Sequence, residues 1–206
     1  FDPGGDGMAL VFSEFTPSDL DTKRRNGVAR ATWPLLKARL LPFNSKRNSN
    51  IIGDHRGMHF VRDMIDGVFS SGPEKIAIII NNDIKVDAKL GDSIRKGCDA
   101  FGCWWAYRVE APGTKTDLGA DLFAVTRFWW AMHRHLFPDL LIGYWWWDDI
   151  TVRIMLWSGC SEQERLYYHE PHPAAVETRG ETPGMIYNQK LALEFLKQHH
   201  ELQGKP

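Results

Sequence analysis

The sequence predicts a single α/β domain in which a mixed sheet is flanked by helices. The run Ile76–Ile80 is aliphatic at every position, which is typical of a central strand covered by helices on both faces. Between Met58 and Val68, apolar residues recur at steps of three and four, as in an amphipathic helix. The length of 206 residues is enough for one self-sufficient core and short for two.

The other elements follow in order along the chain. The apolar run Met8–Phe12 predicts a first strand, and the helix after it is interrupted at Pro34, because proline removes a backbone donor. Near the end, Thr182 and Pro183 predict a helix start, since threonine caps helices and proline suits their first position. Apolar patterning predicts further strands at 51–52, 98–110, 119–126 and 166–168, and helices at 19–40, 58–71, 87–97, 127–137, 148–157 and 182–199.

Charge and cysteine content narrow the functional classes. The formal net charge of −1 argues against a surface built throughout to bind polyanions, although the stretch 21–62 has ten Lys or Arg against two Asp. That stretch is either a solvated helix face or a site for a pyrophosphate or a phosphate backbone. Three cysteines without a CxxC spacing predict neither a disulfide framework nor a zinc site.

With no apolar run near roughly 20 residues and no signal-like start, we expect a cytoplasmic protein without a membrane span.

Several common catalytic motifs do not occur in the sequence. It has no GxxxxGK[ST] loop, no GxSxG elbow and no HExxH helix, and its one glycine-rich stretch, 4–7, precedes the first strand. P-loop, Rossmann-dinucleotide, serine-hydrolase and zinc-protease functions therefore lack support.

The remaining polar residues suit an oxygen-rich site with one imidazole. Asn81, Asn82 and Asp83 follow the strand Ile76–Ile80 directly, and ligands of open α/β sheets bind beyond the carboxyl ends of strands. Mn²⁺ or Mg²⁺ bridging a diphosphate needs only one or two protein ligands, because phosphate oxygens and water complete the octahedron. Each acid also has a plain structural interpretation, as a turn former or a helix cap. The other candidates lie further along the chain: Asp121, Asp148, Asp149, His169 and His172.

Nine tryptophans are a further unusual feature. Most are expected to fill the core, as large aromatic side chains usually do. The three consecutive indoles at 145–147 cannot all face one way on a helix or strand, so we expect at least one of them to line a cleft.

The order of several sequence segments resembles that found in the glycosyltransferases of the GT-A fold. The resemblance rests on an aliphatic strand that ends in NND, followed by GADLFAVTRFWW, FPDLLIGYWWWDDI, YYHEPHP and MIYNQKLA, and it covers about 25–188. It implies a Rossmann-like mixed sheet flanked by helices in one domain over 1–206. In this resemblance, about 8–100 forms the nucleotide-sugar-binding half and about 101–206 forms the acceptor and catalytic half.

The resemblance also implies roles for particular residues. Asp83 resembles the metal-binding acid of the DxD motif, whose first acid is replaced here by Asn81, and Asn82 would lie near the sugar or ribose. Arg25, with its neighbour Arg24, resembles an early arginine that approaches the nucleotide. The remaining implied roles are a catalytic base at Asp148 or Asp149, acceptor or sugar contacts at Asp121, Trp146 and Trp147, and a late metal ligand at His169 or His172.

The expected activity is the metal-dependent transfer of a sugar from a nucleotide-sugar donor, expected to be a UDP-sugar, to an acceptor hydroxyl. A carboxylate base implies direct displacement and inversion at the sugar carbon. One hypothesis for the acceptor is a modified DNA base, and a small sugar, a lipid-linked glycan or a protein hydroxyl fits the sequence equally. The alternatives are a sugar nucleotidyltransferase, which would need a glycine-rich loop after Phe12, and a non-catalytic module that stacks sugars or bases on tryptophans.

Overall fold

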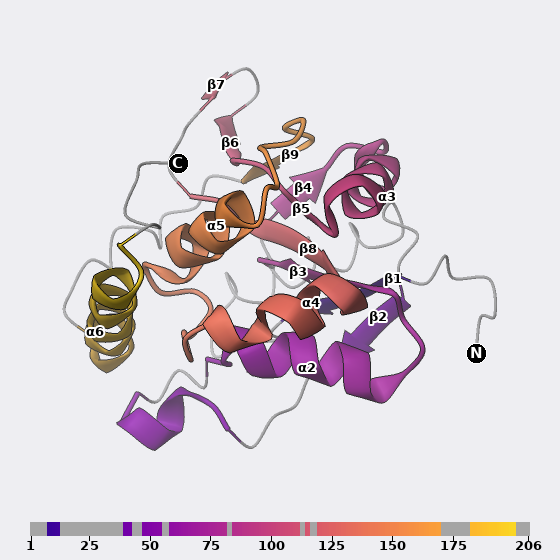
Figure 1. The fold of residues 1–206 in the computed structure, drawn as a ribbon. Helices are drawn as coiled ribbons and strands as arrows, with labels where there is room; N and C mark the ends of the chain where they lie inside the picture. Colours follow the sequence, from indigo (N-terminus) through magenta and orange to yellow (C-terminus); the bar gives the residue numbers. More distant parts are fainter. Residues whose placement is uncertain are drawn as a thin grey trace.

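A five-stranded mixed sheet forms the centre of the protein in its computed structural model, which describes residues 8–12, 39–42, 47–54, 58–81, 84–111, 114–115, 119–169 and 182–200 (Figure 1). Strand β1 runs parallel to β2 and to β3, whereas β8 runs antiparallel to both β3 and β5. The predicted mixed α/β fold is therefore confirmed. The strand order is β2 (Arg39–Pro42), β1 (Met8–Phe12), β3 (Ile76–Ile80), β8 (Leu122–Thr126) and β5 (Cys103–Trp105).

The sheet takes strands from both halves of the chain. β3 pairs along its whole length with β8, from Ile76 opposite Thr126 to Ile80 opposite Leu122. This register places the carboxyl end of β3 beside the amino end of β8. Residues that follow Ile80 and residues that precede Leu122 therefore meet at one edge of the sheet.

A second, smaller sheet extends from that same edge. Its order is β4 (Ile84–Val86), β9 (Tyr167–His169), β6 (Val109–Ala111) and β7 (Thr114–Lys115). β4 and β9 are antiparallel, with Ile84 opposite His169, and β6 is parallel to β9. Because β4 begins only four residues after β3 ends, the small sheet is anchored close to the end of the central strand.

Helices cover both faces of the central sheet. Alternate residues of β3 separate the two sides: Ala77 and Ile79 belong to the core under α2 and α5, whereas Ile78 packs with α3. α2 and α4 lie side by side (Figure 1), and Arg134, just after α4, forms an ion pair with Asp66 of α2. The helices are α2 (Val61–Ser71), α3 (Leu90–Phe101), α4 (Arg127–His133), α5 (Trp147–Trp157) and α6 (Pro183–Gln198), with short 3-10 turns η2 (Ser49–Ile52) and η3 (Arg134–Leu136).

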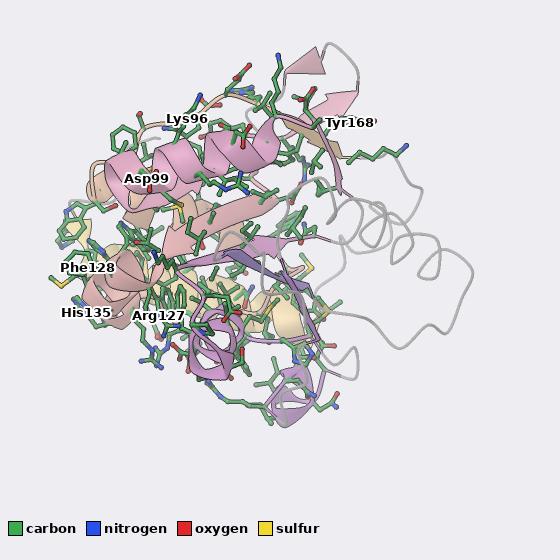
Figure 2. The ribbon with its side chains drawn as sticks, turned by 90° about the vertical axis from the view of Figure 1, so that its right-hand side faces the viewer. Lys96, Asp99, Arg127, Phe128, His135 and Tyr168 are labelled. Carbon is green, nitrogen blue, oxygen red and sulfur yellow. The ribbon has the colours of Figure 1, made fainter. Side chains whose placement is uncertain are left out.

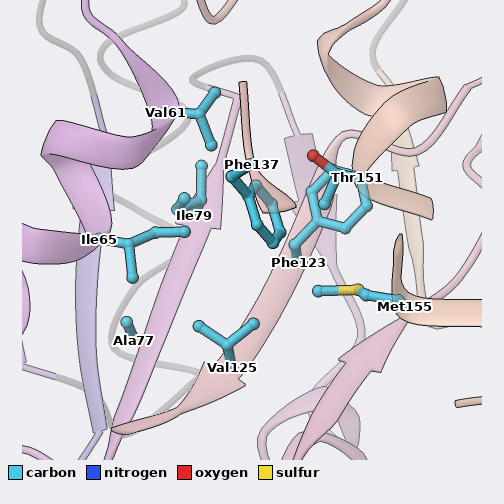
Figure 3. Close-up of a pocket in the computed structure, with 9 residues that line it drawn as sticks. All are labelled: Val61, Ile65, Ala77, Ile79, Phe123, Val125, Phe137, Thr151 and Met155. Carbon is cyan, nitrogen blue, oxygen red and sulfur yellow. The ribbon is translucent and has the colours of Figure 1, made fainter. Parts of the chain in front are cut away.

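An internal cavity of about 10 Å³ lies in the core between the sheet, α2 and α5 (Figure 3). This volume is close to the space that a single water needs. The hydroxyl of Thr151 donates a hydrogen bond to the carbonyl of Trp147 at 2.6 Å, so it is already satisfied. The cavity is thus a small packing gap. Apolar side chains make up the rest of its lining: Val61, Ile65, Ala77, Ile79, Phe123, Val125, Phe137 and Met155.

Three predicted elements differ from the structure by more than the position of their ends. The expected strand at 51–52 is part of η2, because Asn48 caps the turn through its side chain and Gly53 ends it in the left-handed conformation at φ 78°. The expected strand at 98–110 is divided, since α3 continues to Phe101 and only Cys103–Trp105 and Val109–Ala111 are strands. The predicted helix at 19–40 lies mostly outside the described residues, and its end falls in β2.

α4 exposes two large apolar side chains, Phe128 and Met132. Phe128 is 77 % exposed, and it lies on the opposite side of the molecule from Tyr168 of β9 (Figure 2). Within the described residues, no helix is long and apolar enough to cross a membrane.

Candidate functional site

The end of β3 is tied to the start of β8 through Asn81 and Asp121. The backbone N–H of Asn81 donates to the carbonyl of Asp121 at 3.0 Å, and its side-chain Nδ2 donates to Asp121 Oδ1 at 2.7 Å. An aspartate at position 81 would place two carboxylates against each other. An asparagine at position 81 therefore has a local structural reason.

Asp121 is held from a second side by Arg108. Arg108 Nη1 lies 3.1 Å from Asp121 Oδ2, so each carboxylate oxygen accepts a hydrogen bond. The backbone N–H of Asp121 donates to the hydroxyl of Tyr167 at 3.1 Å, and that hydroxyl donates to the carbonyl of Ala106 at 2.5 Å. Burial and then the charge of Asp121 raise the pKa of Tyr167 well above its usual value, which keeps the hydroxyl protonated. Asp121, only 4 % exposed, is the centre of a preorganised polar network.

The carboxylate of Asp148 reaches this network from α5. A Cβ atom added to Gly119 would lie 2.6 Å from Asp148 Oδ2, so the carboxylate rests directly on the backbone two residues before Asp121. Gly119 also has φ +84°, a conformation that favours glycine. Its carbonyl accepts from the backbone N–H of Arg108 at 3.3 Å. Asp148, Asp121 and Arg108 are thus brought together although they come from three separate segments: α5, the residues before β8 and the loop between β5 and β6.

The environment of Asp148 disfavours its charged form. Burial raises the pKa of the Asp148 carboxyl to about 7, and the negative charge of Asp121 adds to the rise. The backbone N–H groups of Asp148 and Asp149 lower this pKa in part, because they hydrogen-bond the carboxylate in the first turn of α5. The result is a carboxyl that changes protonation near neutral pH.

Asp149 has a different role from its neighbour. Its Oδ2 lies 2.8 Å from Arg153 Nε, an ion pair one turn along α5. Its carboxylate is therefore engaged along the helix surface, whereas that of Asp148 lies against Gly119. Of the two acids predicted as base, Asp148 is the one that belongs to the polar network.

The three consecutive tryptophans lie in three different environments. Trp147 is 3 % exposed and packs edge-on against Phe123 with ring centroids 5.3 Å apart, so its indole lies in the core. The acceptor or sugar contact expected at Trp147 stays a prediction. Trp146 is half-buried and has φ 82°, the one non-glycine residue with positive φ in the described part of the chain. Trp145 is 61 % exposed. A left-handed tryptophan immediately before Asp148's helix is a strained conformation that the surrounding structure must hold.

The predicted metal ligands lie largely outside the described residues. This applies to Asp83 and His172, as it does to Asn82, Arg24 and Arg25. The backbone of His169 is described, and it pairs with Ile84, the residue that follows Asp83 in the sequence. Among the side chains that the structure describes, no group of three or more His, Cys, Asp or Glu could hold a metal ion. The metal site stays a prediction.

Sequence reasoning did not find all members of the network. Arg108 stands in no motif, and only strand pairing brings it to Asp121. Tyr167 has an aromatic position in a short strand, which gives no hint that its hydroxyl bridges Asp121 and Ala106. Gly119 had a weak signal, because a glycine directly before a buried strand often marks a close approach of another chain segment.

Comparisons of the chain with protein-family models, with curated proteins and with solved structures find no match.

Proposed function

We propose that this protein is a nucleotide-sugar-dependent glycosyltransferase with a GT-A-like fold, in which Asp148 is the catalytic base. The observation that carries the proposal is the position of the Asp148 carboxylate. It lies against Gly119, at the edge of the sheet where the central strand β3 ends, and its pKa is raised to about 7. Ligands of α/β sheets bind at this edge.

A carboxylate with this pKa suits the removal of a proton from an acceptor hydroxyl. General-base catalysis is most effective when the pKa of the base is near the working pH, because the base is then both ionised and sufficiently basic. An ordinary aspartate with pKa near 3.9 would be a much weaker base. Attack by the activated hydroxyl on the sugar carbon would displace the nucleoside diphosphate directly and invert that carbon.

The donor would lie on the β3 side of the network. Asn81, at the end of β3, is followed in the sequence by Asn82 and Asp83, and the pairing of Ile84 with His169 brings β9 alongside. Asp83 with His169 or His172 would hold Mn²⁺ or Mg²⁺, which would supply positive charge for the departing diphosphate. The parallel pairing of β1 with β2 and with β3 supports this placement, because nucleotides bind beyond the carboxyl ends of parallel strands.

Charge near the base favours an uncharged acceptor over a nucleic acid. Asp148 lies within a network that contains Asp121, and Asp149 stands next to it on α5. Among the described side chains of this network, Arg108 pairs with Asp121 and Arg153 pairs with Asp149, so the ionised form of Asp148 would add a negative charge that repels a phosphate backbone. A modified DNA base remains an acceptor hypothesis through the basic stretch 21–62.

The proposal is tested by incubating the protein with a panel of UDP-sugars and Mn²⁺, with and without EDTA, and measuring nucleotide release. We expect release from at least one donor, and its loss with EDTA. The rival function is a non-catalytic sugar-binding module, which exposed Trp145 would serve as a stacking surface. Binding of sugars without release from any donor would support that module and contradict the transferase.

A further inference from the structure

The loop 141–146, which leads into α5 and Asp148, lies across the inner side of α6. Asn188 of α6 is completely buried and its side chain bonds only to backbone atoms of this loop in the hydrogen bonds that the structure shows. Its Oδ1 accepts from the N–H of Leu141 at 2.9 Å, and its Nδ2 donates to the carbonyls of Leu141 at 2.9 Å and of Trp145 at 3.1 Å. A single amide therefore fixes both ends of a five-residue segment.

A second contact between α6 and the loop involves Asp54. Asp54 Oδ2 accepts a hydrogen bond from the N–H of Gly184, in the first turn of α6, at 3.1 Å, and also from the hydroxyl of Tyr144. A Cβ atom on Gly184 would lie 2.4 Å from Tyr144 Cε2 and 2.5 Å from Asp54 Oδ2. Any other residue at this position would therefore force the side chain of Tyr144 or Asp54 to shift.

These contacts end where the backbone is strained. Trp146 follows the anchored carbonyl of Trp145 and has φ 82°, a conformation that costs a non-glycine residue about 1 kcal/mol or more. Its own carbonyl accepts from the N–H of Ile150 at 3.0 Å and so begins α5. If Trp146 relaxed, the start of α5 would move, and Asp148 in its first turn would move away from Gly119.

We propose that Asn188 is a positioning residue of the site: its amide holds the loop 141–146 in the strained form that seats the Asp148 carboxylate on Gly119. α6 then fixes the conformation of the loop through Asn188, in addition to packing in the core. The inference gains catalytic meaning from the proposed function, but its geometric content is independent of any substrate.

The test compares two variants of α6. Asn188→Ala removes the three hydrogen bonds to the loop, whereas Phe195→Ala, the matched control, removes a core side chain that is 5 % exposed from the same helix. The titration of Asp148 is followed by ¹³C NMR of the aspartate carboxyl groups, with Asp148→Asn to assign the signal, and the melting temperature of each variant is recorded.

We expect Asn188→Ala to lower the titration midpoint of Asp148 by one pH unit or more, because a displaced carboxylate regains water. Phe195→Ala should lower the melting temperature and leave the midpoint within about 0.3 unit of that of the unaltered protein. Equal midpoints in both variants would overturn the inference. Should Asn188→Ala not fold, Asn188→Ser serves instead, since its side chain is too short to reach both Leu141 and Trp145.

The titration uses no donor, acceptor or metal, so its outcome is separate from that of the proposed function. If Asn188→Ala lowers the titration midpoint of Asp148 as expected but the protein releases no nucleotide, the positioning role of Asn188 holds and the proposed transferase function is contradicted. In an active protein, Asn188→Ala should lower kcat more than tenfold with little change in the KM for the donor, as expected when the base alone is misplaced.

Discussion

The internal cavity and the polar network at the end of β3 are two regions with opposite properties. The cavity of about 10 Å³ is hollow but almost wholly apolar, and the hydroxyl of its one polar residue, Thr151, is bonded to the backbone. The network is closely packed, with Asp148 against Gly119, yet it contains converging charges and a carboxyl with a raised pKa. The proposed chemistry therefore depends on converging polar groups and not on empty space. Substitutions in the network should alter activity, whereas substitutions at the cavity should alter stability alone.

The largest expected effect is that of Asp148→Asn on turnover. Loss of a general base lowers rates on the order of 10²–10⁴-fold, and asparagine preserves the shape of the side chain. Asp149→Asn is the matched control, because Asp149 is paired with Arg153 and should cost less than tenfold. Initial rates of nucleotide release with acceptor present measure both. Unchanged turnover in Asp148→Asn would remove Asp148 from the mechanism.

The second prediction concerns stability as a function of pH. The folded-state pKa of Asp148 is raised to about 7, above the unfolded value near 3.9, so the folded state binds more protons between these values. The free energy of unfolding should therefore fall as pH rises from about 4 to 7, on the order of 2–4 kcal/mol from this group. Asp148→Asn should lack that loss and be more stable than the unaltered protein at pH 8. Urea denaturation at pH 5 and pH 8 measures the difference, and parallel pH profiles for the two proteins would contradict it.

The elements of the fold also differ in how far the sequence predicts them. The strand Ile76–Ile80 and the start of α6 at Pro183 agree with prediction because their signals are local: an unbroken aliphatic run, and a threonine whose Oγ1 accepts from Met185 N at 3.3 Å. The strand predicted at Ile51 and Ile52 is wrong. Two β-branched residues favour a strand, but the cap at Asn48 and the left-handed Gly53 impose a 3-10 turn.

The candidate site was predicted in part, and the missing part is non-local. Asn81, Asp121 and Asp148 were named from motifs, and the structure brings all three into one network. Arg108 joins them because β5 pairs with β8, which brings the loop after β5 beside the residues that precede β8, and no local pattern encodes this pairing. The burial of Trp147 likewise depends on where α5 begins, and that start is set by the left-handed Trp146.

A smaller effect is expected from Asn81→Asp. The Nδ2 donor that lies 2.7 Å from Asp121 Oδ1 would become a carboxylate oxygen, and the repulsion should cost about 2 kcal/mol at pH 8. Because like charges raise a carboxyl pKa in the folded state, this cost should shrink as the pH falls toward 4 and one carboxyl takes up a proton. Asn81→Ser removes the same hydrogen bond without adding charge and serves as the control. Denaturation curves in which both variants lose the same stability at both pH values would count against the contact.

The smallest effects are expected at the cavity and would sharpen the contrast with the network. Val125→Ile adds one methylene toward the cavity, and Ile79→Val enlarges it by one, so the free energy of unfolding should change by about 1 kcal/mol or less, with Ile79→Val the less stable. Neither side chain touches the polar network in the contacts that the structure shows for these residues, so nucleotide release and the titration of Asp148 should stay within twofold and about 0.3 pH unit of the unaltered protein. Thermal denaturation and initial rates test both statements. The cavity can affect the proposed reaction only by shifting α5, which lines it and carries Asp148. A cavity variant with normal stability but lost turnover would therefore contradict the contrast, because it would show that packing at the cavity controls the reaction.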